Sequence, residues 1–171
     1  LPVRVLGRCG GALSDVVDGI VWAAGGEVPG VPANTTPADV INVSLGGGGV
    51  CSAGSAMHAA IGFAISRGAT VVVAAGNAAM DAAYVSPASC TQAITVGATN
   101  VHTARAFYSN FGEVVDLSAP GGDMDPADNE RAWIWQAVNA GKRGPEGDTF
   151  GGMVGTSMSA PHVAGIAALM Q

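Results

Sequence analysis

The sequence predicts an α/β fold, built as a single domain around a mostly parallel sheet. Short runs of β-branched residues alternate along the chain with segments of helical periodicity, which is the pattern of strands joined by crossover helices. One run, at residues 70–75, is apolar throughout, as expected of a strand buried on both faces of a parallel sheet. The 26 glycines cluster where the strands would end, and they indicate tight turns there.

The composition argues against several classes of protein. With 49% apolar and 12% charged residues, the chain of 171 residues is too apolar to be disordered and long enough to bury one core. The net charge is −6 and Lys142 is the single lysine, so there is no basic patch and we expect no nucleic-acid partner. No apolar run approaches the roughly 18 residues of a membrane span, so we expect no membrane partner.

The first half of the chain predicts strands at 3–6 and 40–44, each followed by a helix. We expect Ser14 to be the N-cap of the first helix. The apolar face of this helix follows the spacing i, i+3, i+4 and i+7 and comprises Val17, Ile20, Val21 and Ala24. The second helix should end at Gly68, in a left-handed conformation. Its apolar face comprises Met57, Ala60, Ile61 and Ala64.

The second half predicts strands at 70–75, 93–96 and 114–117 and a final helix at 158–170. Residues 121–150 are expected to be mostly loop. Pro161 is expected in the first turn of the final helix, where its missing N–H costs nothing. We find no internal repeat and no domain boundary, so residues 1–171 are treated as one unit.

Ser157 lies at the start of the final helix, where the positive end of the helix dipole and unpaired N–H groups favour an anion. A serine in this position is ordinarily an N-cap. Here, however, the whole run 155–165, Gly-Thr-Ser-Met-Ser-Ala-Pro-His-Val-Ala-Gly, closely resembles the nucleophile motif of the subtilisin family. The resemblance implies a three-layer subtilisin-like fold and a secreted serine endopeptidase that forms an acyl-enzyme on Ser157.

The run 73–77, Val-Ala-Ala-Gly-Asn, resembles the family segment whose asparagine donates into the oxyanion hole. The resemblance implies that Asn77 has this role. The chemistry requires such a donor, because a tetrahedral intermediate places a negative charge on the former carbonyl oxygen. Without the serine motif, a turn residue after Gly76 would be the simpler interpretation of Asn77.

The run 41–47, Ile-Asn-Val-Ser-Leu-Gly-Gly, resembles the family strand that lines the substrate cleft. It implies that Ser44, Leu45 and Gly46 pair with a polypeptide substrate in extended conformation. A wall of the primary specificity pocket would then comprise Ala74, Ala75 and Gly76. The alternative of a phosphate-binding loop at 46–49 lacks both the G-x-G-x-x-G spacing and a following Gly-Lys-Ser/Thr.

The three cysteines, Cys9, Cys51 and Cys90, leave two interpretations open. They form no Cys-x-x-Cys pair and have no histidine at metal-ligand spacing, so a zinc site is not expected. They are either three free thiols, or a Cys51–Cys90 disulfide with Cys9 paired to a residue upstream of this chain.

The subtilisin chemistry requires no cofactor, but the resemblance implies a structural calcium ion. Asp116 aligns with a calcium-binding aspartate of some family members, and the backbone carbonyls of Thr91 and Ala93 would complete the site. A solvated loop aspartate is the alternative. A second acidic run is better explained as a solvated loop; it comprises Asp123, Asp125, Asp128 and Glu130.

The aspartate and histidine motifs of the subtilisin triad do not occur in this sequence. His58 and His102 do not replace them convincingly, and His162 belongs to the serine motif, where the family residue is structural. We therefore expect a partial catalytic domain, truncated at both ends and inactive alone, from a parent that is a monomer when intact. The alternatives are a non-catalytic, peptide-binding subtilisin-like module and, more distantly, a nucleotide-binding α/β domain.

Overall fold

Residues 1–124, 132–141 and 144–171 are described by a computed structural model. The helices are α1 Leu13–Ala23, α2 Ala56–Ser66 and α3 Thr156–Leu169, with a 3-10 turn at Ala82–Tyr84. The strands are β1 Val40–Val43, β2 Gly47–Gly48, β3 Thr70–Ala74, β4 Val85–Ser86, β5 Ile94–Thr99, β6 Leu117–Pro120, β7 Ile134–Asn139 and β8 Asp148–Met153. None of the helices in these residues is long and apolar enough to cross a membrane.

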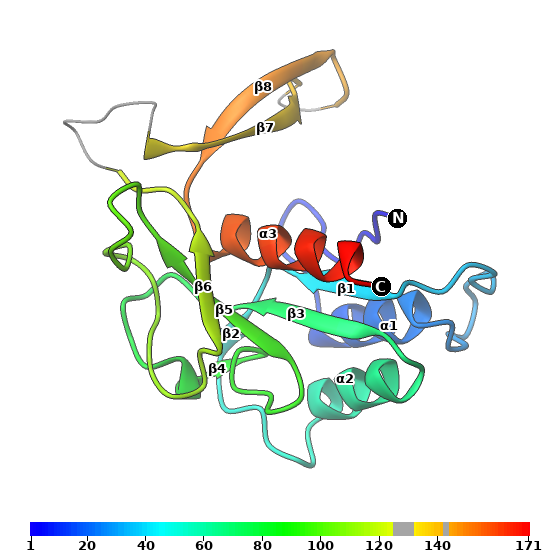
Figure 1. Ribbon diagram of the computed structural model, residues 1–171. Helices are drawn as coiled ribbons and strands as arrows, with labels where there is room; N and C mark the ends of the chain where they lie inside the picture. The colour runs from blue at the N-terminus through cyan, green and yellow to red at the C-terminus, as the bar shows by residue number, and fades with distance from the viewer. Residues whose placement is uncertain (125–131, 142–143) are drawn as a thin grey trace.

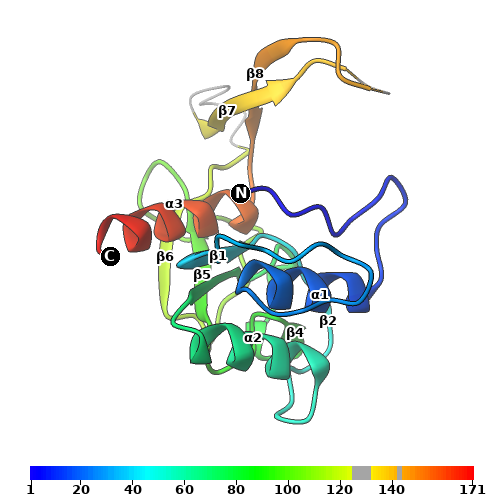
Figure 2. The ribbon, with the colours of Figure 1, turned by 90° about the vertical axis from the view of Figure 1, so that its right-hand side faces the viewer.

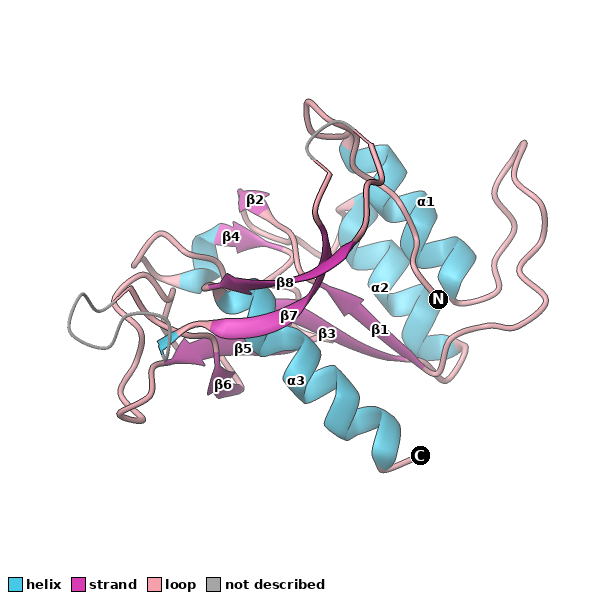
Figure 3. Cartoon of the chain, turned by 90° about the horizontal axis from the view of Figure 1, so that it is seen from above, coloured by secondary structure: helices cyan, strands magenta, loops and turns pink. Residues whose placement is uncertain are grey.

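Three layers form the body of the molecule, as the sequence predicts. The central sheet has the order β1-β3-β5-β6, and each neighbouring pair is parallel. Helices α1 and α2 cover one face of this sheet and α3 covers the other (Figure 1, Figure 2). Seen from above, α3 crosses the sheet and its N-terminal end lies near the ends of β1 and β3 (Figure 3). The four-stranded sheet therefore separates two hydrophobic cores.

Strand β3 shows why the sheet is covered on both sides. Its side chains alternate in direction, so Val71 and Val73 belong to the core under α1 and α2, whereas Val72 and Ala74 belong to the core under α3. All four are buried, with Val72 and Val73 fully so. The continuous apolar run is thus a strand buried on both faces, as predicted.

Helix α2 forms as the sequence predicts. Ser55 is its N-cap and accepts a hydrogen bond from the His58 N–H at 3.2 Å. Gly68 follows the helix with a φ of +93°, the left-handed conformation expected after a helix end. The predicted apolar face is buried throughout: Met57, Ala60, Ile61 and Ala64.

Two predictions at the N-terminal end are wrong. Residues 3–6 do not form a strand. In the described chain no strand pairs with them, and Val5 packs on the core under α1 and α2 instead. Helix α1 begins at Leu13, so Ala12 occupies the N-cap position and Ser14 already lies inside the helix. The predicted apolar face does contact the core: Ile20 and Ala24 are buried, and Val17 and Val21 are partly buried against it. Val16 and Ala23, which were not predicted, are buried as well.

The segment predicted as mostly loop contains an antiparallel hairpin of β7 and β8. The hairpin projects from the body of the molecule above the N-terminal end of α3 (Figure 1). Its residues are largely exposed and β8 contains Gly151 and Gly152, so the segment lacks the buried apolar pattern that marked the other strands. Strand β6 likewise begins at Leu117 rather than at 114, because Val114 and Val115 pack against a small core outside the sheet.

Of the two interpretations of the cysteines, the disulfide is found for Cys51 and Cys90, whose Cα atoms lie 5.0 Å apart. Cys9 is exposed and free. The bridge joins the segment before α2 to the segment before β5, across 39 positions of the chain. It therefore ties the loop after β2 to the sheet that carries the site described below.

We expect loss of this disulfide to destabilise the protein. A Cys51→Ala/Cys90→Ala variant should lose roughly 2–4 kcal/mol of free energy of unfolding, because the closed loop no longer restricts the unfolded chain. Chemical denaturation measures this loss, and Cys9→Ala is the matched control that should leave stability unchanged. A similar loss in both variants would contradict the assignment.

Candidate active site

Helix α3 presents Ser157 at its N-terminal end. The N-cap is Gly155, whose φ of +149° favours glycine, and Ser157 is the second residue of the helix. The first amides of a helix have no partner within it, so they can donate to a group just beyond the helix end. Ser157 is half-buried and Thr156 is fully buried. A nucleophile here would face solvent on one side and be held by the helix on the other.

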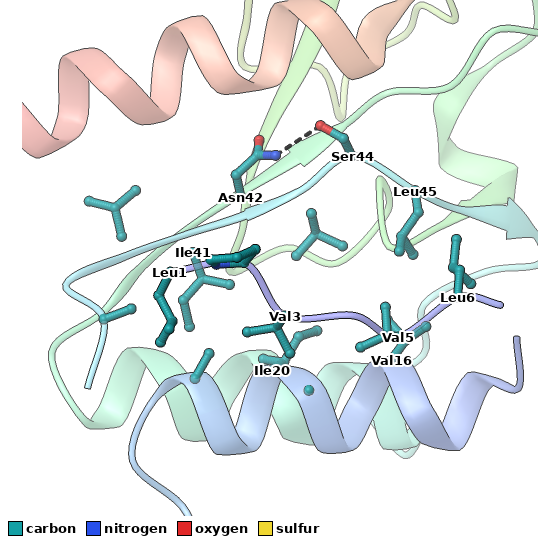
Figure 4. A pocket seen from close by; sticks show the side chains of 16 residues that line it. Leu1, Val3, Val5, Leu6, Val16, Ile20, Ile41, Asn42, Ser44 and Leu45 are labelled. Carbon is teal, nitrogen blue, oxygen red and sulfur yellow. Dashed lines mark hydrogen bonds between the residues drawn. The ribbon is translucent and has the colours of Figure 1, made fainter. Parts of the chain in front are cut away.

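Ser44 and Ser157 bind each other in both directions. The Ser157 hydroxyl donates to the Ser44 carbonyl oxygen at 3.2 Å, and the Ser44 hydroxyl donates to the Ser157 carbonyl oxygen at 2.9 Å. The Ser44 hydroxyl also accepts from Asn42 Nδ2 at 2.9 Å (Figure 4). The sequence predicted Ser44 as a backbone contact for substrate, but it gave no sign that its hydroxyl would reach Ser157.

Pro161 explains why the Ser157 carbonyl is open to Ser44. Residue 161 would normally donate its N–H to the carbonyl four residues earlier, which is that of Ser157, and proline has no N–H to donate. Pro161 lies in the second turn of α3, not in the first turn as predicted, because the helix already begins at Thr156. The hydroxyl of Ser44 therefore replaces the missing helix hydrogen bond.

Asn77 leaves the end of β3 and points its side chain toward the start of α3. Its Oδ1 accepts from the Thr156 N–H and from the Thr156 hydroxyl, both at 2.8 Å. Thr156 Oγ1 in turn accepts from the Gly76 N–H at 3.1 Å. These bonds occupy the oxygen end of the Asn77 amide, so any donation from this side chain into the neighbouring cavity comes from Nδ2. Thr156 was not identified as a site residue from the sequence, because its role depends on contacts about eighty positions away.

A cavity of about 410 Å³ opens beside Ser157 and Asn77. Ala74 and Gly76 line it, as predicted for the specificity pocket, and none of its described lining residues carries a charge. Ala75 is instead fully buried and packs with a small core that includes Val85. Larger apolar side chains in the lining are Leu45, Met80 and Val85. The cavity can therefore accept an apolar group next to the serine.

Leu45 and Gly46, which were predicted to bind substrate together with Ser44, follow β1 and both line this cavity. A Cβ on Gly46 would come within 2.9 Å of the Ser86 carbonyl oxygen, so this glycine is required by the chain itself. The next two residues form β2 and pair with β4. The chain thus remains extended as it passes the serine.

A second cavity, of about 490 Å³, lies between residues 1–6, α1 and β1 (Figure 4). Its lining is mainly apolar and includes Val3, Val5 and Ile20. Among the described strands, β1 is at the edge of the sheet on this side. Asn42 and Ser44 border this cavity, while Ser44 also contacts Ser157.

The three histidines lie in three different parts of the fold. His58 is on α2, across the sheet from α3, and His102 is in the loop after β5. His162 is on α3 and its Nδ1 lies 2.7 Å from the Met158 carbonyl oxygen. The hydrogen bond of the Ser157 hydroxyl goes to Ser44.

Of the three residues predicted to bind calcium, Asp116 is the one that would do so through its side chain. This exposed aspartate accepts from the Thr95 N–H at 2.8 Å, which brings its carboxylate beside the segment that contains Thr91 and Ala93. Within the described ranges, no group of three or more His, Cys, Asp or Glu side chains could hold a metal ion. Of the second acidic run, Asp123 bonds Asn100, and Asp125, Asp128 and Glu130 lie outside the described residues.

Tyr108 anchors the backbone on the hairpin side of the serine. Its hydroxyl lies 2.8 Å and 2.7 Å from the carbonyl oxygens of Gly121 and Gly122, and Gly121 also accepts from the Gly155 N–H at 2.8 Å. Burial raises the pKa of Tyr108 to about 12, so the hydroxyl keeps its proton even at alkaline pH, where an exposed tyrosine begins to ionise. The N-cap of α3 is thereby tied to the end of β6.

A half-buried serine at a helix N-terminus, beside an asparagine that follows a parallel strand, is the arrangement that the resemblance to the subtilisin family implies. The model of the subtilase family matches residues 1–171, and the chain belongs to this family.

Relatives with known names are proteases. The chain is 52% identical over its whole length to an extracellular protease of Xanthomonas campestris pv. campestris and 46% identical over 99% of its length to an extracellular basic protease of Dichelobacter nodosus. It covers 27% and 26% of these relatives, about a quarter of their length.

Solved structures agree. A protease from Pseudoalteromonas arctica superposes with a TM-score of 0.93 at 49% identity, covering 99% of this chain and 49% of that one. A cold-adapted subtilisin-like serine proteinase superposes with a TM-score of 0.73 at 34% identity, covering 98% and 51%. The subtilisin-like fold predicted from the sequence is confirmed.

The free energy of unfolding can test whether the Ser44 hydroxyl replaces the helix hydrogen bond that Pro161 cannot make. Ser44→Ala should lower the free energy of unfolding by about 1–2 kcal/mol, because the Ser157 carbonyl loses its donor. In a Pro161→Ala background the helix regains its own N–H for that carbonyl, so the same substitution should cost about 1 kcal/mol less. Chemical denaturation of the wild type and the three variants measures the coupling, and strictly additive effects would contradict it.

Proposed function

We propose that this chain carries the nucleophile, the oxyanion hole and part of the substrate cleft of an extracellular serine endopeptidase. The observation that supports it best is the pair of bonds from Thr156 to Asn77 Oδ1, since they direct the Asn77 amide N–H group toward the cavity at Ser157. Membership of the subtilase family and relatives named extracellular proteases support the same reaction.

In the proposed reaction, Ser157 Oγ attacks the carbonyl carbon of a peptide bond while a general base takes the hydroxyl proton. The resulting oxyanion accepts hydrogen bonds from Asn77 Nδ2 and from the Ser157 backbone N–H at the start of α3. The base then protonates the leaving amine, which leaves an acyl group on Ser157. A water molecule, deprotonated by the same base, hydrolyses the acyl-enzyme and restores the serine.

The general base and its orienting carboxylate are proposed to come from a part of the parent protein outside residues 1–171. Two observations support this. The Ser157 hydroxyl bonds the Ser44 carbonyl, and the relatives named as proteases are about four times as long as the chain. Residues 1–171 alone should then lack turnover.

The proposed substrate is an extended polypeptide with an apolar side chain next to the cleaved bond. The backbone of Ser44, Leu45 and Gly46 would pair with it as an added strand. The uncharged cavity lined by Ala74, Met80 and Val85 would take the side chain.

An extracellular location is supported by the Cys51–Cys90 disulfide, because such bonds persist in oxidising surroundings. We propose a monomer.

The experiment uses the full-length protein and the isolated residues 1–171. In the full-length protein we expect Ser157→Ala to abolish peptide hydrolysis. Asn77→Leu should lower kcat by about 10²–10³-fold with little change in KM, a range established for an oxyanion donor in a subtilisin. A fluorophosphonate probe should label the full-length protein on Ser157 and leave isolated residues 1–171 unlabelled.

Two outcomes of these experiments would contradict the proposal. Full-length protein that binds peptides but neither hydrolyses them nor reacts with the probe would indicate the non-catalytic module instead. Robust labelling of Ser157 in pure residues 1–171 would contradict the proposed external base.

We also propose that Asp116 binds a structural calcium ion together with the carbonyl oxygens of Thr91 and Ala93. The carboxylate and carbonyl oxygens are hard ligands that suit calcium, and the bond from Asp116 to the Thr95 N–H brings the carboxylate beside this segment. The ion would stabilise the folded state and take no part in the chemistry.

For this site, added calcium should raise the Tm of the full-length protein and a chelator should reverse the rise. Asp116→Asn should remove the calcium-dependent part, whereas Glu113→Gln, an exposed neighbouring acid, should retain it. A calcium response that survives in Asp116→Asn would place the ion elsewhere.

A further inference from the structure

Asn110 is a buried side chain that holds the loop carrying Asn77. It is 2% exposed and lies in the segment between β5 and β6. Its Nδ2 donates to the Ala75 carbonyl oxygen at 2.8 Å. Its Oδ1 accepts from the Ala78 N–H at 2.9 Å and from the Met80 N–H at 3.2 Å. A single amide thus binds the chain on both sides of Asn77.

The backbone of Asn110 adds a fourth bond to the same loop. Its N–H donates to the Gly76 carbonyl oxygen at 2.9 Å. Gly76 has a φ of +103°, and a Cβ at this position would collide with Asn110 Nδ2. The residues immediately before and after Asn77 are therefore both bonded to Asn110.

The loop has a conformation that the chain would not keep without such contacts. Besides Gly76, Ala79 has a positive φ of 50°, which is uncommon for a residue with a Cβ. Such conformations persist where surrounding contacts impose them. The Ala79 N–H donates to the Tyr108 carbonyl oxygen at 2.9 Å, close to Asn110 in the sequence. The segment 108–110 therefore acts as the support of the loop.

Only a carboxamide satisfies all three side-chain contacts. It offers an N–H to the Ala75 carbonyl and an oxygen with two lone pairs to two N–H groups. An ionised aspartate has no proton for the carbonyl, and a leucine of similar size offers neither group. Because the site is buried, each group left without a partner costs free energy.

We propose that Asn110 is a positioning residue for the oxyanion hole. Thr156 fixes the Oδ1 end of Asn77, and Asn110 fixes the backbone from which that side chain extends. Together they set where Asn77 Nδ2 lies. An oxyanion donor acts only within about 2.7–3.1 Å of the oxyanion, and a misplacement of about 1 Å can cost roughly 10²-fold in rate. This inference rests on the proposed function of Asn77.

The test measures kcat and KM of the full-length protein with Asn110→Leu. We expect kcat to fall by about tenfold or more and KM to change by less than about twofold, because the loss falls on the transition state. Asn34→Leu is the matched control: Asn34 is a half-buried carboxamide whose Nδ2 donates to the carbonyl oxygens of Trp22 and Ala23, both at 3.1 Å, at the end of α1 and away from the loop. Its kcat should stay near that of the wild type. A folded Asn110→Leu protein with wild-type kcat would overturn the proposal.

Asn110→Asp covers the case in which the leucine variant does not fold. The carboxylate keeps the acceptor for Ala78 and Met80 but donates to Ala75 only when protonated. The ratio of its kcat to that of the wild type should therefore be low at neutral pH and should rise as the pH falls. A ratio near one at every pH would overturn the proposal.

A double-mutant cycle separates this inference from the proposed function. If Asn110 acts through Asn77, combining Asn110→Leu or Asn110→Asp with Asn77→Leu should lower kcat no further than Asn77→Leu alone. Independent, multiplicative losses would overturn the positioning role and leave the oxyanion role intact. If Asn77→Leu alone leaves kcat unchanged, the oxyanion role itself is wrong, and the inference that depends on it is overturned as well.

Discussion

The hydrogen bonds between Thr156 and the Gly76–Asn77 segment are the interaction on which the site depends. They connect the first residue of α3 to the end of β3 across about eighty positions of sequence. Without them, the Asn77 amide could rotate and either end could face Ser157. The fully buried Thr156 hydroxyl therefore sets the direction of an exposed side chain, and the buried position keeps water from competing for those bonds.

The parallel sheet explains why these residues meet. Strands β1 and β3 run in the same direction, so the residues that follow them, Ser44 and Asn77, emerge at the same edge. Helix α3 packs across the strands and brings Ser157 to that edge from the other side (Figure 3). Val73 packs in the core under α1 and α2 and Val72 in the core under α3, so one strand holds helices on both faces of the sheet. The site is thus a consequence of strand direction and of a strand buried on both faces.

Much of this could be predicted from the sequence, because the signals are local. The apolar run of β3, the spacing of Met57, Ala60, Ile61 and Ala64, and the serine motif all lie within single elements. What could not be predicted depends on distant partners. Asn110 resembles any loop asparagine until its bonds to the loop after β3 are seen, and the hydroxyl of Ser44 gains its role only because Pro161 leaves a carbonyl open.

The failed predictions have the same origin. Residues 3–6 have the composition of a strand but no strand to pair with in the described chain, so they remain extended along α1. The β7–β8 hairpin buries little, and an exposed hairpin with glycines carries almost no apolar pattern. Ser14 is a good N-cap by type, but the helix has its N-cap two positions earlier, at Ala12, whose side chain offers no bond.

The element that carries Ser157 follows β1 and β3 in the sequence, so it is synthesised after both of the strands that it meets. The support for Asn77 from Asn110 is complete once the sheet has formed, but the bonds from Thr156 and the pairing with Ser44 close loops of about eighty and more than a hundred residues. Loops of this size form slowly compared with local turns. A growing chain therefore has the strands and the loop of Asn77 before it has the serine, so a molecule in which these long loops have not closed has no organised site for chemistry.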